Sequence, residues 1–232
     1  MAEITRHNEG ELRRGPLKPT LLFMLLLILI LGCATTPAWA DVVPVQNASF
    51  EVTNALNIPC TIPANCDFNL GPIPDWTLTG QGGSWHPSTA FLNLPLPDGN
   101  IVAYNNGGTI SQTLGTFLAP NTTYTLSVDV GHRLDASVTD YSIGLFAGGN
   151  LLKSFGASNG AIPIGTFAEE TVTFTSGASV ASGENLSIVL TSGGLQADFD
   201  NVRLTASTVP EPASLSLLAV GCGLALFVLR RR

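Results

Sequence analysis

The stretch Thr123-Tyr124-Thr125-Leu126-Ser127-Val128-Asp129-Val130 alternates polar and apolar side chains along its whole length. Two-residue alternation rich in β-branched residues predicts a β-strand with one face toward a core. The same pattern returns in three later runs, residues 170–175, 186–190 and 199–204. Clusters of Gly and Asn, which favour turns, occupy residues 105–108, 148–150 and 158–160. Short strands separated by turns at this spacing indicate an all-β sandwich or barrel.

Residues 53–98 have a different character from these alternating runs. They are rich in proline, contain scattered aromatic residues and show no clear period. We therefore expect long loops here that decorate one face of the sheet framework. No helical period of useful length occurs outside two apolar segments near the ends of the chain.

The composition excludes several classes of protein. Of the 232 residues, 45% are hydrophobic and only 12% are charged, whereas globular chains average about 25% charged residues. This excludes a coiled coil and a charged disordered chain. The net charge of −7 argues against a nucleic-acid partner, because proteins that bind nucleic acids carry a basic footprint.

The first apolar segment, Leu21 to Leu31, follows three basic residues and precedes Ala38-Trp39-Ala40. A basic region, a short apolar core and an A-x-A site together predict a secretory signal peptide over residues 1–40, cleaved after Ala40. Two alternatives remain open. Cys33 follows Ile-Leu-Gly, which resembles a lipidation site, and Arg13-Arg14 resembles a twin-arginine export motif.

The second apolar segment, Ala213 to Leu229, carries no charge and runs into Arg230-Arg231-Arg232. Its length is at the lower limit for a transmembrane helix, and the arginines would mark the cytoplasmic end in the inner membrane. Directly before it stands Pro210-Glu211-Pro212. An ordinary tail anchor after a proline-rich linker is the simpler interpretation.

This arrangement resembles the PEP-CTERM sorting signal over residues 209–232. The resemblance implies a Gram-negative bacterium and an exosortase-type sorting enzyme as partner. It also implies transient contact of the helix with the inner membrane, followed by its removal. The chain would then be delivered to the periplasm, the cell envelope or the extracellular matrix.

Residues 41–208 remain as one domain, with thirteen acidic and three basic side chains. Its cysteines are Cys60 and Cys66. In an oxidising periplasm, this spacing predicts a disulfide that closes a local loop. A metal site or redox pair is the alternative, but there is no C-x-x-C motif and no histidine nearby.

A family resemblance becomes specific when motifs are taken in chain order. The domain opens with Asn47-Ala48-Ser49-Phe50-Glu51 and closes with Phe199-Asp200-Asn201-Val202-Arg203-Leu204. Between them stand further family-like segments at residues 73–76, 97–104, 110–114 and 121–126. The succession resembles galactose-binding-like jelly rolls and carbohydrate-binding modules, and most of all the bacterial secreted proteins related to the hapalindole-type (Stig) cyclases. It implies a jelly-roll β-sandwich that binds calcium.

The resemblance also implies where the calcium would bind. In the related modules, the Glu of the opening motif and the Asp of the closing motif meet at Ca²⁺, and these positions are Glu51 and Asp200 here. Calcium prefers six to eight oxygen ligands, and the first and last strands of such sandwiches are commonly neighbours. The alternative is that both carboxylates are solvated separately or accept hydrogen bonds from backbone amides.

Candidates for binding an organic ligand are the aromatic residues and histidine of the loop region, since aromatic faces pair with sugar rings and other flat apolar ligands. They are Trp76, Trp85, His86, Phe91 and Tyr104. Trp76 fits a core position and a binding position equally well. We expect Trp85 to be partly exposed, and we expect His86 to be more often a hydrogen-bonded loop residue than a ligand contact.

The first hypothesis for function is a non-enzymatic, secreted β-sandwich that binds a glycan or another component of the extracellular matrix. The alternative is a calcium-dependent, cyclase-like enzyme acting on a hydrophobic small molecule. The resemblance to the cyclases implies an acid near the last strands, for which Asp198 is the candidate, with Tyr104 among the nearby binding residues. The third hypothesis is a purely structural matrix protein with no discrete ligand. A closed aromatic cavity around Asp198 favours the enzyme, whereas an open groove with an exposed Trp85 favours binding.

Overall fold

The computed structural model describes residues 40–61, 65–209 and 221. The predicted signal peptide up to residue 39, the Pro210-Glu211-Pro212 motif and the predicted C-terminal helix with its arginines, residue 221 excepted, lie outside these residues. Within the described part of the chain, no helix combines the length and the hydropathy that a membrane crossing needs.

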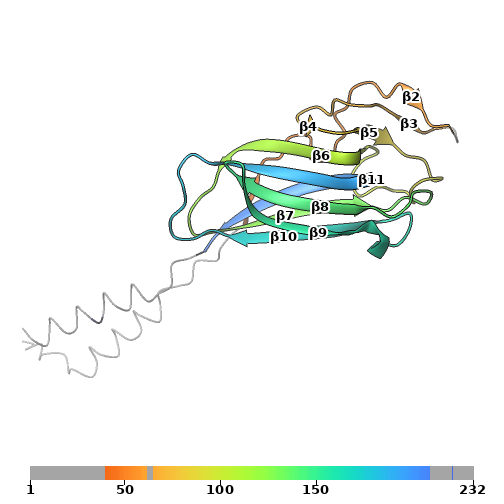
Figure 1. The fold of residues 1–232 in the computed structure, drawn as a ribbon. Coiled ribbons are helices and arrows are strands. Elements are labelled where there is room, and N and C mark those ends of the chain that lie inside the picture. The colour runs from red at the N-terminus through yellow and green to blue at the C-terminus, as the bar shows by residue number, and fades with distance from the viewer. Residues whose placement is uncertain (1–39, 62–64, 210–220, 222–232) are drawn as a thin grey trace, which may run out of the picture. The chain divides into compact units, whose positions relative to one another are not determined.

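The protein is an all-β jelly-roll sandwich, whose strands are all connected through β6 and β11 (Figure 1). The strands are β1 (Ala40–Val43), β2 (Ile58–Pro59), β3 (Asp67–Phe68), β4 (Thr77–Leu78), β5 (Gly82–His86), β6 (Val102–Phe117), β7 (Thr122–Gly131), β8 (Asp140–Ala147), β9 (Asn150–Ser158), β10 (Phe167–Thr175) and β11 (Asn185–Thr208). One short 3-10 helix, η1 (Asn159–Ala161), follows β9. All strand pairs are antiparallel.

The two longest strands, β6 and β11, belong to both layers of the sandwich. The first half of β11 pairs with β8 and with the end of β6. These three segments form the first sheet together with β9 and β4. The second half of β11 pairs with β7 and with the start of β6. These segments form the second sheet together with β10, β5, β3 and β2. Strand β1 pairs with the end of β11, so the first and last strands are neighbours, as expected from the sequence.

Glycines allow both long strands to bend between the layers. The register of β11 against β6 shifts between Ser192 and Gln196, and Gly194 lies at φ +142°. On β6, Gly107 and Gly108 have φ values of +87° and +147°, where a side chain would be strained. The turn predicted at residues 105–108 is therefore wrong. The strand continues through a bend, because its partner β11 bends at the same level.

The main core lies between the two sheets and follows the alternation predicted from the sequence. Leu126, Val128 and Val130 of β7 are fully buried there, as are Leu204 and Phe199 of β11. The predicted strands at residues 123–130 and 170–175 lie within β7 and β10. The runs at 186–190 and 199–204 belong to one strand, β11.

A second, smaller apolar cluster lies on the outer face of the second sheet. It contains Trp85, Val102 and Tyr104 from the sheet, with Leu92 and Leu96 from a loop. Residues 53–98 form mostly loops, as predicted, with only short strands among them. These loops cover a sheet face that would otherwise be exposed to solvent.

Candidate functional site

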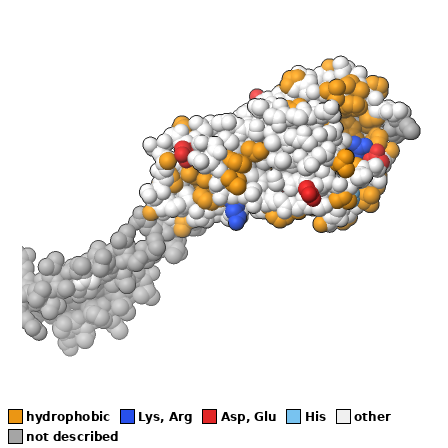
Figure 2. Space-filling model, viewed as in Figure 1, with side chains coloured by type: hydrophobic (Ala, Val, Ile, Leu, Met, Phe, Trp, Pro, Cys, Tyr) orange, Lys and Arg blue, Asp and Glu red, His pale blue; other side chains and the backbone are white. Residues whose placement is uncertain are grey.

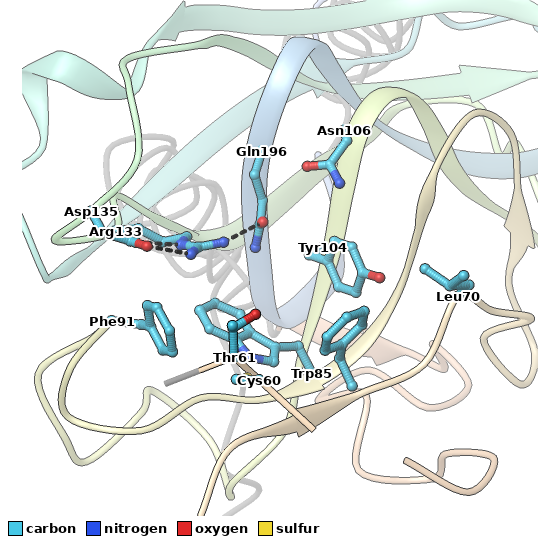
Figure 3. A pocket seen from close by; sticks show the side chains of 11 residues that line it. Cys60, Thr61, Leu70, Trp85, Phe91, Tyr104, Asn106, Arg133, Asp135 and Gln196 are labelled. Atoms are coloured by element: carbon cyan, nitrogen blue, oxygen red, sulfur yellow. Dashed lines mark hydrogen bonds and ion pairs between the residues drawn. The ribbon is translucent and has the colours of Figure 1, made fainter. Parts of the chain in front are cut away.

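A cavity of about 450 Å³ lies between the outer face of the second sheet and the loops around it (Figure 3). We call it the outer pocket. Its lining side chains come from β3, β5, β6, β11 and four loop segments, and they are Cys60, Thr61, Phe68, Leu70, Trp85, Phe91, Tyr104, Asn106, Arg133, Asp135 and Gln196.

Aromatic rings form much of the wall of the outer pocket. Trp85 and Phe91 meet edge to face with their centroids 5.6 Å apart, and Phe68 and Tyr104 do so at 6.1 Å. Trp85 is only 3% exposed, so the prediction of a partly exposed Trp85 is wrong. Local Gly-rich sequence suggested exposure, but the loop that carries Phe91 folds over the indole.

The disulfide loop supports the same aromatic wall. The structure joins Cys60 to Cys66 by a disulfide, and the backbone N–H of Cys60 donates to the carbonyl of Cys66. The indole Nε1 of Trp85 donates to the Sγ of Cys66 at 3.2 Å. The disulfide therefore fixes the orientation of the Trp85 ring as well as the loop.

Arg133 packs against the aromatic wall and is held in place by an ion pair. Its guanidinium carbon lies 4.8 Å from the ring centroid of Trp85 and 5.0 Å from that of Phe91, within the range of cation–π attraction. Its Nε and Nη2 donate to the two carboxylate oxygens of Asp135 at 2.9 and 2.8 Å. Its Nη1 donates to the amide oxygen of Gln196 (Figure 3).

Asp198 lies directly behind this wall and is completely buried. It stands opposite Tyr104 on β6 and Gly131 on β7. Its Oδ1 accepts a hydrogen bond from Nε2 of Gln196 at 2.7 Å, while its Oδ2 has no partner. Burial raises the pKa of Asp198 to about 6, against the opposing effect of the Gln196 bond and the Arg133 charge.

Tyr104 connects Asp198 to the outer pocket. Its ring lines the cavity, and its hydroxyl donates to the backbone carbonyl of Asn69 at 2.7 Å. Burial, followed by the nearby charge of Asp198, raises the pKa of Tyr104 to about 12. The phenol therefore stays protonated at physiological pH. The structure thus brings Asp198 and Tyr104 together beside one aromatic cavity.

The other predicted ligand-binding residues lie elsewhere. Trp76 is buried in the main core, where its ring packs 5.2 Å from Phe50 and its Nε1 donates to the carbonyl of Asn47. His86 follows Trp85 on β5 and does not line the outer pocket. Its Nδ1 lies 3.3 Å from a carboxylate oxygen of Asp67 in a partly exposed pair.

The two predicted calcium ligands converge on one loop, although they are 149 positions apart in the chain. Glu51 Oε1 accepts hydrogen bonds from the backbone N–H groups of Asn100 and Ile101, both at 2.7 Å. Asp200 Oδ2 accepts one from the backbone N–H of Asp98 at 3.0 Å. Gly99 sits between them at φ +68°, and a Cβ there would lie 2.3 Å from the Glu51 carboxyl group.

The chemistry of this loop suits a hard cation. Burial raises the pKa of Asp200 to about 7, and the charges of Asp98 and Asp129 act in the same direction. A cation would offset this crowding of negative charge, and carboxylate oxygens are the donors that calcium prefers. Among residues 40–61 and 65–209, however, no group of three or more His, Cys, Asp or Glu side chains could hold a metal. Glu51 and Asp200 would therefore need backbone carbonyls and water to complete the set.

Sequence reasoning did not identify Arg133, Asp135 or Gln196 as part of the site. A weak signal existed, because Arg133 is one of three basic residues in an acidic domain. Gln196 also lies two positions before Asp198, and residues two apart in a strand share a face.

Comparison with known proteins places this domain in a family. Residues 41–205 match the HpiC1-like family, described as HpiC1 cyclase, and residues 208–232 match the PEP-CTERM protein-sorting motif. This motif indicates export and sorting to the cell envelope or the extracellular space. The curated proteins gave no match.

Two solved cyclase structures are similar to this chain in sequence and in fold. A cyclase from Fischerella sp. TAU in complex with 4-(1H-indol-3-yl)butan-2-one is 27% identical with a TM-score of 0.59, and the match covers 73% of this chain and 99% of that chain. A Stig cyclase from the same organism, in complex with an indole derivative, is 26% identical with a TM-score of 0.58, over 74% of this chain and all of that chain. TmCBM61, bound to β-1,4-galactotriose, is 13% identical with a TM-score of 0.44, over 71% of this chain and 98% of that chain.

Because the match covers 99% of the Fischerella cyclase, the sandwich domain corresponds to a complete folded protein in that relative. The family match covers well over half of the chain, and the order of strands around the outer pocket is that of one jelly roll. The chain therefore belongs to the HpiC1-like cyclase family and carries a PEP-CTERM sorting motif at its end.

Proposed function

We propose that the sandwich domain binds a flat, apolar aromatic small molecule in the outer pocket and catalyses its cyclisation by proton transfer from Asp198. One observation carries this proposal. A fully buried carboxyl group with an unpartnered oxygen lies directly behind the aromatic wall of the outer pocket. Perturbed buried acids beside concave apolar pockets are typical of acid–base catalysts.

The outer pocket suits such a ligand in size and surface. A volume of about 450 Å³ lies within the range of small-molecule sites. The rings of Trp85, Phe91 and Tyr104 supply apolar contact, while Asn106 and Gln196 supply a few polar groups at the cavity wall. The related Fischerella cyclase was solved with an indole ligand, which makes indole a reasonable probe for this chain.

The proposed step is balanced without a co-reactant. Protonated Asp198 gives its proton to an electron-rich atom of the substrate, which leaves an aspartate and a substrate cation. Ring closure uses an electron pair of the substrate itself, and the aspartate then takes a proton back from the closed product. A pKa near 6 keeps part of Asp198 protonated near neutral pH, which suits a general acid.

Calcium would act on the framework of this site. Glu51 and Asp200 would hold the ion, which would supply positive charge where carboxylates crowd the 98–101 loop. Asp200 shares its strand face with Asp198, so Asp200 and the 98–101 loop affect the position of the acid.

Glycan binding is the second candidate function, and the sorting motif favours it because sorted proteins reach a polymer-rich compartment. The site itself supports glycan binding less well. The sequence-based criterion for glycan binding is an open groove with an exposed Trp85, whereas Trp85 is only 3% exposed.

The test uses indole and the purified domain of residues 41–209 in D₂O. Protonation of indole at C3 followed by loss of the original proton replaces C3–H by C3–D, which NMR detects. We expect the domain to bind indole and accelerate this exchange. We expect Asp198→Asn to lower the exchange rate at saturating indole about 100-fold or more, since general acids contribute roughly 10²–10⁴-fold.

Asp140→Asn, at an exposed aspartate on β8, serves as the matched control and should leave the exchange rate unchanged. Failure of the unmodified domain to accelerate exchange would overturn the proposed function. Binding of an oligosaccharide at the outer pocket, with no binding of indole, would favour the glycan function instead.

A further inference from the structure

A continuous chain of polar contacts runs from the rim of the outer pocket to the buried acid. Both carboxylate oxygens of Asp135 bind Arg133, Arg133 binds the amide oxygen of Gln196, and the amide nitrogen of Gln196 binds Oδ1 of Asp198. In Figure 3 the side chains of Asp135, Arg133 and Gln196 lie in one row and are joined by dashed lines.

The chemistry of Arg133 fixes the direction of this chain. A guanidinium group has only donors and remains charged at all relevant pH values. The amide oxygen of Gln196 must therefore face Arg133, and its NH₂ group must face Asp198. An amide held only by Asp198 could turn over and present its oxygen to a protonated acid.

Arg133 is itself held by three side chains, so the orientation that it imposes on Gln196 is firm. The bidentate pair with Asp135 fixes the plane of the guanidinium. The rings of Trp85 and Phe91 support one side of it at 4.8 and 5.0 Å. Groups fixed by packing and by hydrogen bonds place a functional side chain more precisely than a single contact does.

We propose that Gln196, oriented by Arg133, is a positioning residue that keeps Oδ1 of Asp198 as a hydrogen-bond acceptor and so leaves the transferable proton on Oδ2. This inference rests on the proposed function, because it assigns the proton that the acid donates. An N–H donor directed at Oδ1 makes an O–H at that atom unfavourable. Oδ2, which has no partner, is then the oxygen that carries the proton.

Two variants of Gln196 separate positioning from a structural role. Gln196→Met removes both amide contacts with little change in volume. Gln196→Glu keeps an oxygen for Arg133 but presents an oxygen instead of an N–H to Asp198, so a proton on Asp198 is drawn to Oδ1. Gln81→Met changes an exposed glutamine away from the pocket lining and is the matched control.

Each variant of the 41–209 domain is assayed for indole affinity by calorimetry and for indole exchange in D₂O at saturation. We expect both Gln196 variants to lower the exchange rate about 10-fold or more while the Kd for indole changes less than about 3-fold. Gln81→Met should change neither quantity.

Three results would overturn the inference. Unchanged exchange in both Gln196 variants, with normal exchange in the unmodified domain, would remove the positioning role alone. Loss of exchange in Gln196→Met with full exchange in Gln196→Glu would mean that Gln196 only tethers Arg133. Absence of exchange in the unmodified domain would overturn the proposed function, and this inference would fail with it.

Discussion

The two faces of β11 differ sharply within five consecutive residues. On the inner face, Ala197 and Phe199 pack into the main core and leave no polar group buried. On the outer face, Gln196, Asp198 and Asp200 are polar, and the two carboxyl groups are fully buried under loops. Both faces belong to the same strand and the same sheet, so the difference lies in what covers each face.

This difference indicates that the inner face of β11 stabilises the fold, whereas the buried carboxyl groups of its outer face do not. A buried carboxyl group loses its hydration, and burial is the main cause of the raised pKa of both Asp198 and Asp200. Functional sites that contain buried carboxyl groups commonly lower the stability of the fold. We therefore expect changes on the inner face to destabilise the domain and some changes on the outer face to stabilise it.

The largest effect should come from the inner face. Phe199→Ala removes a fully buried ring from the main core and leaves a cavity between the sheets. Such truncations cost about 3–5 kcal/mol. Unfolding of the domain in urea should show this loss as a lower midpoint with an unchanged slope. A loss below about 1 kcal/mol would mean that the inner face is not the stabilising one.

Calcium should have the next largest effect, through Glu51 and Asp200. An ion bound only to the folded state stabilises it by about 2.7 kcal/mol at one hundred times its Kd. For a domain of about 150–250 residues this raises the Tm by roughly 5–11 °C. Thermal unfolding with calcium and with EDTA measures the difference.

Asp200→Asn should remove most of the calcium response, because it keeps the shape but removes a ligand charge. Glu51→Gln should do the same from the other side of the 98–101 loop. If neither calcium nor EDTA changed the Tm of the unmodified domain, the calcium site would be excluded. The two carboxylates would then only accept hydrogen bonds from backbone amides of the loop.

A substitution at Asp198 should have a smaller effect on the free energy of unfolding, and it should stabilise the domain where Phe199→Ala destabilises it. Its pKa is raised from 3.8 to about 6 in the folded state, so the folded domain binds a proton more tightly than the unfolded chain. Stability should therefore fall as the pH rises from about 4 to about 6 and stay lower above that range. Asp198→Asn removes the buried charge and should stabilise the domain by about 1–2 kcal/mol at pH 8.

Urea unfolding at pH 8 and pH 4.5, at a fixed saturating calcium concentration, checks this prediction. The gain in Asp198→Asn should be present at pH 8 and largely absent at pH 4.5. A destabilised variant at pH 8 would mean that the charged form of Asp198 is well solvated or paired, and the contrast between the two faces would be lost.

The framework could be predicted from the sequence because its signals are local. Alternation over residues 123–130 is sufficient to place a strand and its inner face. The sequence predicts a turn at Gly107 and Gly108 where β6 bends, because glycines with positive φ occur both in turns and in bent strands. What distinguishes them is the partner strand, β11, which lies about 85 positions later in the chain.

The outer pocket could be predicted only in part. Analogy with the cyclases led to Asp198, and the list of candidate ligand-binding aromatics contained Tyr104; the structure places the two residues opposite each other. The bond between Arg133 and Gln196 joins residues 63 positions apart on two different elements. The burial of Trp85 depends on loops that carry Phe91 and Arg133. Neither composition nor period encodes such contacts, because they arise only when distant loops pack on the same sheet face.

The smallest effect should come from His86, which lies on β5 outside the lining of the outer pocket. Its imidazole lies 3.3 Å from Asp67, and the two side chains are 39% and 43% exposed. Exposed pairs of this kind contribute about 0–1 kcal/mol. His86 also points away from the outer pocket, because it follows Trp85 on β5 and neighbouring strand residues face opposite ways. His86→Ala should therefore change the free energy of unfolding by less than about 0.5 kcal/mol and leave the Kd for indole within about 2-fold. Trp85→Ala, one residue earlier, should weaken indole binding strongly, since it removes the largest ring of the pocket wall. If the two alanine variants weakened binding equally, the ligand would not distinguish the two faces of β5, and the outer pocket would not be its site.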